Sequence, residues 1–162
     1  MRRLAIVALV LAFTMPAGVL AARAPVGSVE FTDARGAITI KARGPLLGRL
    51  DRGTLQIVDL TPADQWSPRV NGVPRGRVVG TRGRDVGFYI PGGRYRVVVR
   101  GEGIFISARG QGIVTIEADP DATGAAGTFS VDDEGPQPLP DTVTRFAYGI
   151  EVSVVPFGSS TP

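Results

Sequence analysis

The sequence predicts an all-β fold, an antiparallel β-sandwich or barrel of about 8–10 short strands. Beyond the first two dozen residues, no stretch keeps an apolar period near 3.6 residues, so amphipathic helices are not expected. Short runs rich in Val, Ile, Thr and Phe recur between breaks that 22 glycines and 13 prolines supply. The expected strands are residues 28–33, 37–42, 46–50, 54–59, 86–90, 94–100, 104–109, 113–118, 128–132 and 143–155.

A β-solenoid is the alternative fold. One series of Arg-Gly pairs begins at residues 35, 43 and 52, and a second begins at residues 100 and 109. Within each series the pairs are eight or nine residues apart. That spacing can mark the corners of a regular coil. A solenoid would stack neighbouring strands in parallel, whereas a sandwich of this kind pairs them antiparallel. The relative direction of neighbouring strands therefore distinguishes the two folds.

The stretch IPGGRYRVVVRGEGIFISARGQGIVTIEA contains three corners marked by glycine. The first two fit two-residue hairpin turns of types I′ and II′, and the third fits a three-residue loop whose last glycine is left-handed. Such turns would pair neighbouring segments as a meander with one continuous apolar face, in which Ile90 lies opposite Tyr95. The glycines assigned to these turns are Gly92, Gly93, Gly101, Gly110 and Gly112.

The N-terminus predicts export. Two arginines precede an uncharged apolar run from Leu4 to Phe13, which is too short to span a bilayer, and Val19-Leu20-Ala21 fits signal-peptidase cleavage after Ala21. Residues 1–21 are therefore expected to be a secretory signal peptide, and no transmembrane segment follows it. Residues 22–27 would form a linker, residues 28–157 a single domain with a long loop at 60–85, and residues 158–162 a tail. The expected location is extracytoplasmic, secreted or in the cell envelope.

The composition excludes several enzyme classes. The chain contains no histidine and no cysteine, so it cannot form a Ser-His-Asp triad, a Cys-His pair or a typical zinc site. A glycan hydrolase that uses two carboxylates is the remaining catalytic alternative. Most acidic residues of the C-terminal third lie in turn-like segments, however, where solvated carboxylates are common. We therefore expect no enzymatic activity.

One acidic segment resembles part of a calcium-binding loop. The sequence DPDATG from Asp119 matches the first half of an EF-hand loop, but Ser130 stands where the bidentate glutamate is required. A solvated acidic turn is the simpler interpretation. A weak calcium site stays open as the alternative, and no other cofactor is expected. Its candidate ligands are Asp119, Asp121, Asp132 and Asp133.

Charge is distributed unevenly along the chain. The formal net charge of +3 falls to +1 without Arg2 and Arg3. Residues 23–109 contain 15 basic and 7 acidic side chains, a net +8, whereas residues 110–162 contain 1 basic and 8 acidic side chains, a net −7. The simplest interpretation is that the two parts interleave and neutralise each other within one fold. Binding of separate partners, or salt-dependent self-association, is the alternative.

Arginines gather around the glycine corners. In the predicted meander Arg94, Arg96, Arg100 and Arg109 lie on or beside the outward face. Solubility and protection of sheet edges would explain them without a ligand. An anionic envelope polymer, a membrane surface or another copy of the chain are the alternative partners. Nucleic acid is not expected, because its binding usually adds stacking aromatic rings, and only Tyr89 and Phe105 would share that face.

Three segments carry a resemblance to a known group of proteins. The runs GRLDRG (48–53) and GGRYRVVVRGEGIFISARGQGIVTIEAD (92–119), followed by FSVDD, LPD and a later Phe, resemble uncharacterised exported proteins of high-GC actinobacteria. The resemblance implies export and an all-β domain, and it brings no activity. The sequence thus favours a secreted or envelope-associated, non-catalytic β-domain that acts as a binding or structural module of unknown ligand.

Overall fold

The computed structural model describes residues 26–76, 78–119, 126–132 and 134–150. The predicted signal peptide and C-terminal tail lie outside these ranges. Within them the chain is all-β, as the sequence predicted, and no helix there could cross a membrane. The strands are β1 (Gly27–Arg43), β2 (Leu46–Asp59), β3 (Arg69–Val70), β4 (Val78–Ile90), β5 (Arg94–Ala118), β6 (Thr128–Val131), β7 (Gln137–Pro138) and β8 (Thr144–Tyr148).

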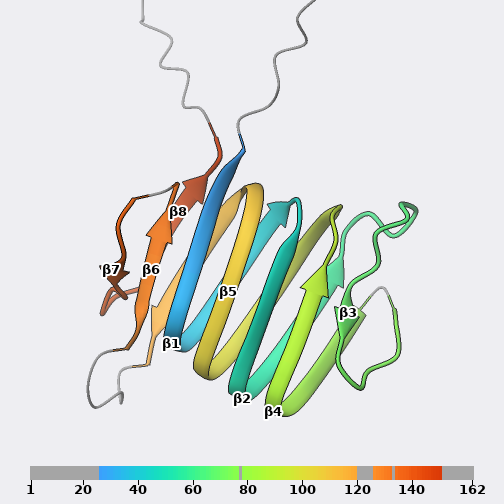
Figure 1. The fold of residues 1–162 in the computed structure, drawn as a ribbon, viewed down its shortest axis with the longest axis horizontal. Helices are drawn as coiled ribbons and strands as arrows, with labels where there is room; N and C mark the ends of the chain where they lie inside the picture. Colours follow the sequence, from blue (N-terminus) through green and yellow to red (C-terminus); the bar gives the residue numbers. More distant parts are fainter. Residues whose placement is uncertain (1–25, 77, 120–125, 133, 151–162) are drawn as a thin grey trace, which may run out of the picture.

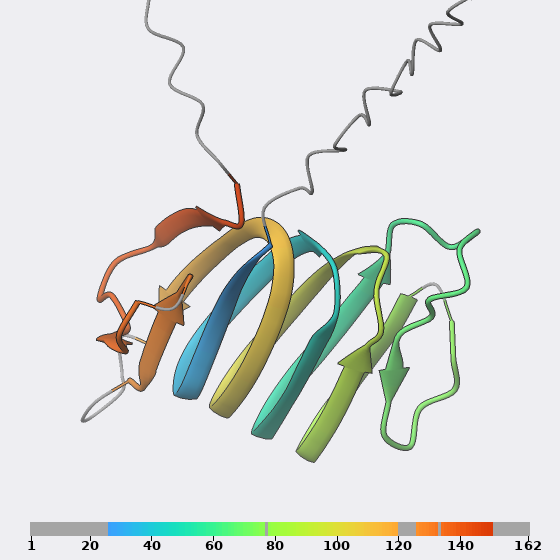
Figure 2. The same cartoon turned by 45° about the horizontal axis from the view of Figure 1, so that its top comes forward.

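The long strands β1, β2, β4 and β5 each bend over and contribute to two layers (Figures 1 and 2). The strand order is β3-β4-β2-β5-β1-β6-β7, with β8 paired to β5. In Figure 1 the front layer contains, from right to left, the segments 84–90, 46–50, 104–110 and 27–32, followed by β6. The back layer contains 78–82, 54–59, 94–100, 37–43 and 111–118, followed by β8.

The register shows that one long hairpin is wound into this sandwich. Residues 27–43 pair with 94–110, and residues 46–58 pair with 78–90, so the outgoing arm of the chain lies beside the returning arm almost throughout. Successive turns of the coiled ribbon pair as well, since Ile38 lies opposite both Val99 and Ile116. In every register the partner numbers fall as the strand numbers rise, so the pairing is antiparallel. This winding gives the strand order of a jelly roll.

The predicted meander is wrong, because each corner carries the chain from one layer to the other. Ile90 lies opposite Leu46 rather than Tyr95, and Tyr95 lies opposite Ala42 and Asp59. The parallel stacking of a solenoid is not found either. The spacing of the Arg-Gly pairs nevertheless does mark corners of a coil, since Gly36, Gly44, Gly53, Gly101 and Gly110 all have positive φ.

Two of the predicted turn glycines have other roles. Gly93 has φ 81°, but Gly92 has no positive φ, so the pair does not form a type I′ turn. Gly112 is not left-handed either. It is instead required for space, because an added Cβ would lie 2.6 Å from the Cβ of Ala42 and 2.9 Å from Cε1 of Tyr148.

The core lies between the two layers and confirms the predicted apolar face. Every second residue of the bent strands points inward, which buries side chains such as Phe88, Val97, Ile106 and Ile116. Tyr95 and Tyr148 are the largest fully buried side chains. The alternation predicted from the sequence therefore identified the buried face correctly, although it assigned the wrong partners.

The long connection is shorter than predicted. The loop expected at 60–85 ends at β4, which begins at Val78, and it contains the short strand β3. Two glycines interrupt the apolar alternation at the start of β4, which is why the sequence did not indicate a strand there. Asp64 organises the remaining loop, since its carboxylate accepts hydrogen bonds from the Thr61 hydroxyl at 2.7 Å and the Trp66 amide at 2.8 Å.

A row of glycines marks the bend from the front layer to the back layer, and we call this row the crease. It consists of Gly83, Gly53, Gly101 and Gly36, which lie opposite one another across four strands. At Gly53 an added Cβ would overlap the carbonyl oxygen of Arg100, and at Gly101 it would overlap that of Arg52. Both residues also have φ 151°. The strands can therefore bend together here only because their backbones approach without side chains between them.

Replacement of Gly101 by alanine should destabilise the fold by about 2 kcal/mol or more, because the Cβ meets rigid backbone and φ is unfavourable. Urea unfolding followed by circular dichroism measures the effect. Gly135→Ala is the matched control, since nothing lies within 4 Å of its added Cβ and it has no positive φ. Equal unfolding midpoints for Gly101→Ala and Gly135→Ala would contradict the steric account of the crease.

Two buried phenols lie in the core without hydrogen-bond partners. Both hydroxyls, those of Tyr95 and Tyr148, are shielded from solvent. Burial raises the pKa of Tyr95, and the neighbouring Tyr148 adds to the rise. Burial also raises the pKa of Tyr148 to about 12. The Tyr95 hydroxyl lowers this pKa, and the negative charge of Asp132 raises it further. Both groups are therefore held neutral by the folded state.

The folded protein should lose stability in alkali. Because the pKa of Tyr148 rises from 10.0 to about 12 on folding, its neutral form stabilises the fold fully below pH 10, and this contribution is lost as pH rises toward 12. Tyr148 should thereby contribute a loss of about 2 kcal/mol to the free energy of unfolding. Urea unfolding at a series of pH values measures this loss. Tyr148→Phe should flatten the profile, whereas Tyr89→Phe, at an exposed tyrosine, should not. Identical profiles for wild type and Tyr148→Phe would contradict this role.

Candidate functional site

Four cations face one another on the outer surface of the back layer. Arg94 lies directly opposite Arg43, and Arg96 lies directly opposite Lys41, on the neighbouring segments 94–100 and 37–43. The alternating residues Tyr95 and Ala42 point into the core, so all four cations share the outward face. Arg96 is half-buried and the other three are exposed. We call Lys41, Arg43, Arg94 and Arg96 the cationic cluster.

Among the described residues, none that flanks the cationic cluster in register is acidic. The Asp64 carboxylate approaches the backbone of Arg94 through the Thr61 hydroxyl, which donates to Asp64 and accepts from the Arg94 amide. The ion pair between Arg52 Nη2 and Glu102 Oε1, at 2.6 Å, lies outside the cluster. The residues that flank the cluster in register are neutral, namely Val58 on one side and Gln111 and Ile113 on the other. Like charges placed directly opposite each other destabilise a sheet. The fold thus maintains two adjacent repulsive pairs on one surface.

The positive surface continues along the back layer. Arg100 follows on the strand of Arg94 and Arg96, and Arg82 lies two strands away in the same row, since both flank Thr54. Arg145 on β8 lies on the same outward face, opposite Thr115. Between the cations the face presents mainly threonine, glutamine and small or aliphatic side chains. Glu117, opposite Ala37 at the end of the row, is the acidic residue that the described strands place on this face.

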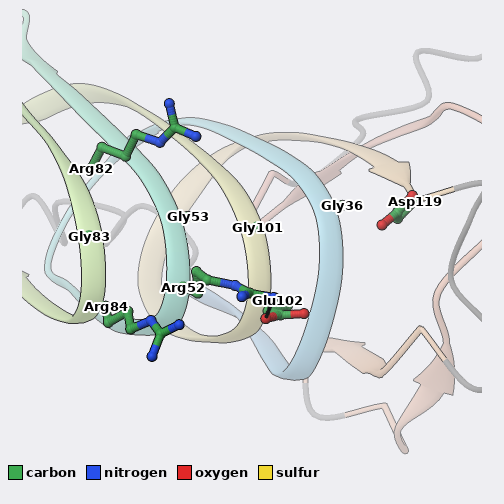
Figure 3. Close-up of a pocket in the computed structure, with 9 residues that line it drawn as sticks. All are labelled: Gly36, Arg52, Gly53, Arg82, Gly83, Arg84, Gly101, Glu102 and Asp119. Carbon is green, nitrogen blue, oxygen red and sulfur yellow. Dashed lines mark ion pairs between the residues drawn. The ribbon is translucent and has the colours of Figure 1, made fainter.

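The crease adjoins this face and forms a hollow of about 550 Å³. Figure 3 shows Arg82 and Arg84 on opposite sides of Gly83, with Arg52 directed toward Glu102. Arg84 lies directly opposite Arg52, so a third like-charge pair occurs here, although Glu102 compensates Arg52. The floor of the hollow is the glycine row, which lets a ligand approach the backbone.

Three of the four predicted binding arginines lie together, and one does not. Arg94, Arg96 and Arg100 share the outer face of the back layer, as the sequence predicted for the outward face of the sheet. The assignment of Arg109 to that face is wrong. It lies opposite Ser28 on the front layer, because the bend at residues 101–103 moves the chain to the other layer before Arg109 is reached. The same bend places Phe105 on the front layer, and Tyr89 lies there as well.

The sequence did not reveal that Lys41 and Arg43 belong to the site. They are more than fifty residues away from Arg94 and Arg96, and the Arg-Gly pair at Arg43 indicates a corner rather than a binding site. The available signal was their alternation with the buried residues Ile40 and Ala42, which fixed their outward direction but not their neighbours.

The predicted calcium ligands do not form a described metal site. Asp121 and Asp133 lie outside the described residues, and within the described ranges no three acidic side chains gather to hold a metal. The carboxylate of Asp132 instead accepts hydrogen bonds from the amides of Ser28 at 2.8 Å and Gly149 at 3.3 Å. It thereby joins the start of β1 to the end of β8. Calcium binding remains a prediction from the sequence.

The acidic part of the chain interleaves with the basic part less than expected. Segment 111–118, β6, β7 and β8 add to one side of the wound hairpin, beyond β1. Described acidic residues of this region, such as Glu134 and Asp141, are exposed there. Charge is therefore separated only in part, because Asp119 lines the crease together with Arg52, Arg82 and Arg84.

Comparison of the chain with protein-family models, with curated proteins and with solved structures gave no match.

Proposed function

We propose that this protein is a secreted or envelope-associated, non-catalytic module that binds an extended anionic polymer. The cationic cluster is the observation that carries the proposal. Two directly opposed like-charge pairs in adjacent rows oppose folding, and an anion placed over them would remove that repulsion. A surface that reduces stability without a ligand is typical of a binding site.

The spacing of the charges favours a polymer over a single small anion. Arg94 and Arg96 are two residues apart on one strand, about 7 Å, and their partners Arg43 and Lys41 lie one strand spacing away, about 5 Å. Arg100 extends the same line along the strand. A chain with repeated phosphate or carboxylate groups can contact these rows in succession, and arginine is suited to both groups.

The composition of the face disfavours two other anionic partners. Nucleic-acid strands are usually held by aromatic rings that stack on bases, and the described strands of this face carry none on their outward side. Peripheral membrane binding usually adds buried apolar side chains to positive charge. The one large, exposed hydrophobic residue of the described strands on this face is Val78, at its edge, with 57% of its surface exposed.

Wild-type protein should bind linear polyphosphate and poly-L-glutamate at low salt, with an affinity that falls steeply as salt is added. Arg94→Gln/Arg96→Gln should bind either polymer about tenfold more weakly or worse. The same double variant should unfold at higher urea concentration, because it removes both repulsive pairs, worth up to about 1 kcal/mol each. Titration with a fluorescent polyphosphate and urea unfolding measure the two effects.

Arg69→Gln/Arg75→Gln is the matched control, because it makes the same change in net charge at two exposed arginines near β3. An equal loss of binding in this control would show that net charge alone acts and would contradict the cluster. Stronger binding to phosphatidylglycerol vesicles than to either polymer would favour a membrane surface instead. A mass by light scattering that increases at low salt without polymer would favour self-association through the separated charges.

A further inference from the structure

The outer face of the front layer contains a second hollow of different chemistry. It has a volume of about 380 Å³ and is lined by three neighbouring segments, 46–50, 104–110 and 27–32. Across these strands Leu47 lies opposite Ser107, Ser107 lies opposite Glu30, and Arg49 lies opposite Phe105. The hollow is separated from the cationic cluster by the whole thickness of the core.

The polar groups of this hollow are held in place by their neighbours. The guanidinium carbon of Arg49 lies 4.3 Å from the centroid of the Phe105 ring, a cation–π contact. On the other side, the Ser107 hydroxyl donates a hydrogen bond to Glu30 Oε1 at 3.2 Å. The strands of Arg49 and Glu30 flank the strand of Phe105 and the two residues are also offset by two positions along it, so they are about 12 Å apart at the backbone. Hydrogen-bond donors thus lie on one side and acceptors on the other.

Apolar surface lies beside these polar groups. Leu47 is 61% exposed and lies directly opposite Tyr89, which is 41% exposed. The half-buried ring of Phe105 belongs to the strand on the other side of Leu47. The hollow therefore combines an aliphatic and aromatic surface with one cation and one anion, whose charges cancel.

We propose that this face binds a neutral glycan. A sugar ring presents C–H groups that pack on apolar and aromatic side chains, and hydroxyls that both donate and accept hydrogen bonds. Here the ring would cover Leu47 and Phe105 while its hydroxyls accept from Arg49 and donate to Glu30. A polyanion gains no net attraction from a hollow whose charges cancel, and a purely apolar ligand would leave both charged groups desolvated. This site is independent of the polyanion site, and together the two would let one module join an anionic polymer to a neutral glycan.

Native electrophoresis in gels that contain hydroxyethyl cellulose, glycol chitin or mannan tests the proposal. Wild-type protein should migrate more slowly in at least one of these gels than in an empty gel, and added salt should not abolish the effect. Glu30→Gln/Arg49→Gln keeps the net charge constant and should weaken glycan binding about tenfold or more. It should leave polyphosphate binding unchanged.

The reciprocal variant Arg94→Gln/Arg96→Gln should lose polyphosphate binding and keep glycan binding, which separates the failure of one site from that of the other. Phe105→Leu keeps apolar volume but removes the ring, and it should also weaken glycan binding. Unchanged migration of the wild type in all three gels would overturn the proposal, as would equal retardation of wild type and Glu30→Gln/Arg49→Gln. A doubled mass in solution that Leu47→Ala abolishes would identify the face as a contact between copies of the chain and would also overturn it.

Discussion

Close approach of backbones at the crease is the constraint on which the rest of the structure depends. Gly53 and Gly101 face each other where the strands bend, and the position of an added Cβ at either one is already filled by a carbonyl oxygen of the neighbouring strand. Because all four strands bend at the same row, each strand serves both layers. The sequence of one strand therefore supplies two different surfaces, one before the crease and one after it.

This division explains why the two outer faces differ in chemistry. On β5 the segment before the crease carries Arg94, Arg96 and Arg100 outward on the back layer, whereas the segment after it carries Phe105, Ser107 and Arg109 outward on the front layer. In a flat meander all of these side chains would share one surface, and arginine would alternate there with aromatic and hydroxyl groups. The bend instead separates a row of cations from a hollow that contains one cation and one anion.

The sequence predicted the strands and the core because burial imposes a period of two on any strand with one buried face. It could not predict which strands pair. A corner that carries the chain to the other layer keeps the alternation of buried and exposed residues, and so does a hairpin turn within one layer. Ile90 and Tyr95 are both buried in either arrangement. The alternation also predicted the outward direction of Arg94 and Arg96. It could not identify their partners Lys41 and Arg43, which come from a strand far away in the sequence. Nor could it assign Arg109 to a layer, because that depends on the bend at residues 101–103.

The continuity of the strands also bears on how the two proposed sites would act together. Arg96 on the back layer and Phe105 on the front layer are nine residues apart on β5, so a load applied between two bound polymers would pass along the backbone through the crease. A sandwich of two separate sheets would resist the same load through side-chain contacts in its core, which can slide apart. In this fold the two layers are joined covalently along each of the four bent strands, so they cannot slide past each other without a change of backbone conformation at the glycines of the crease.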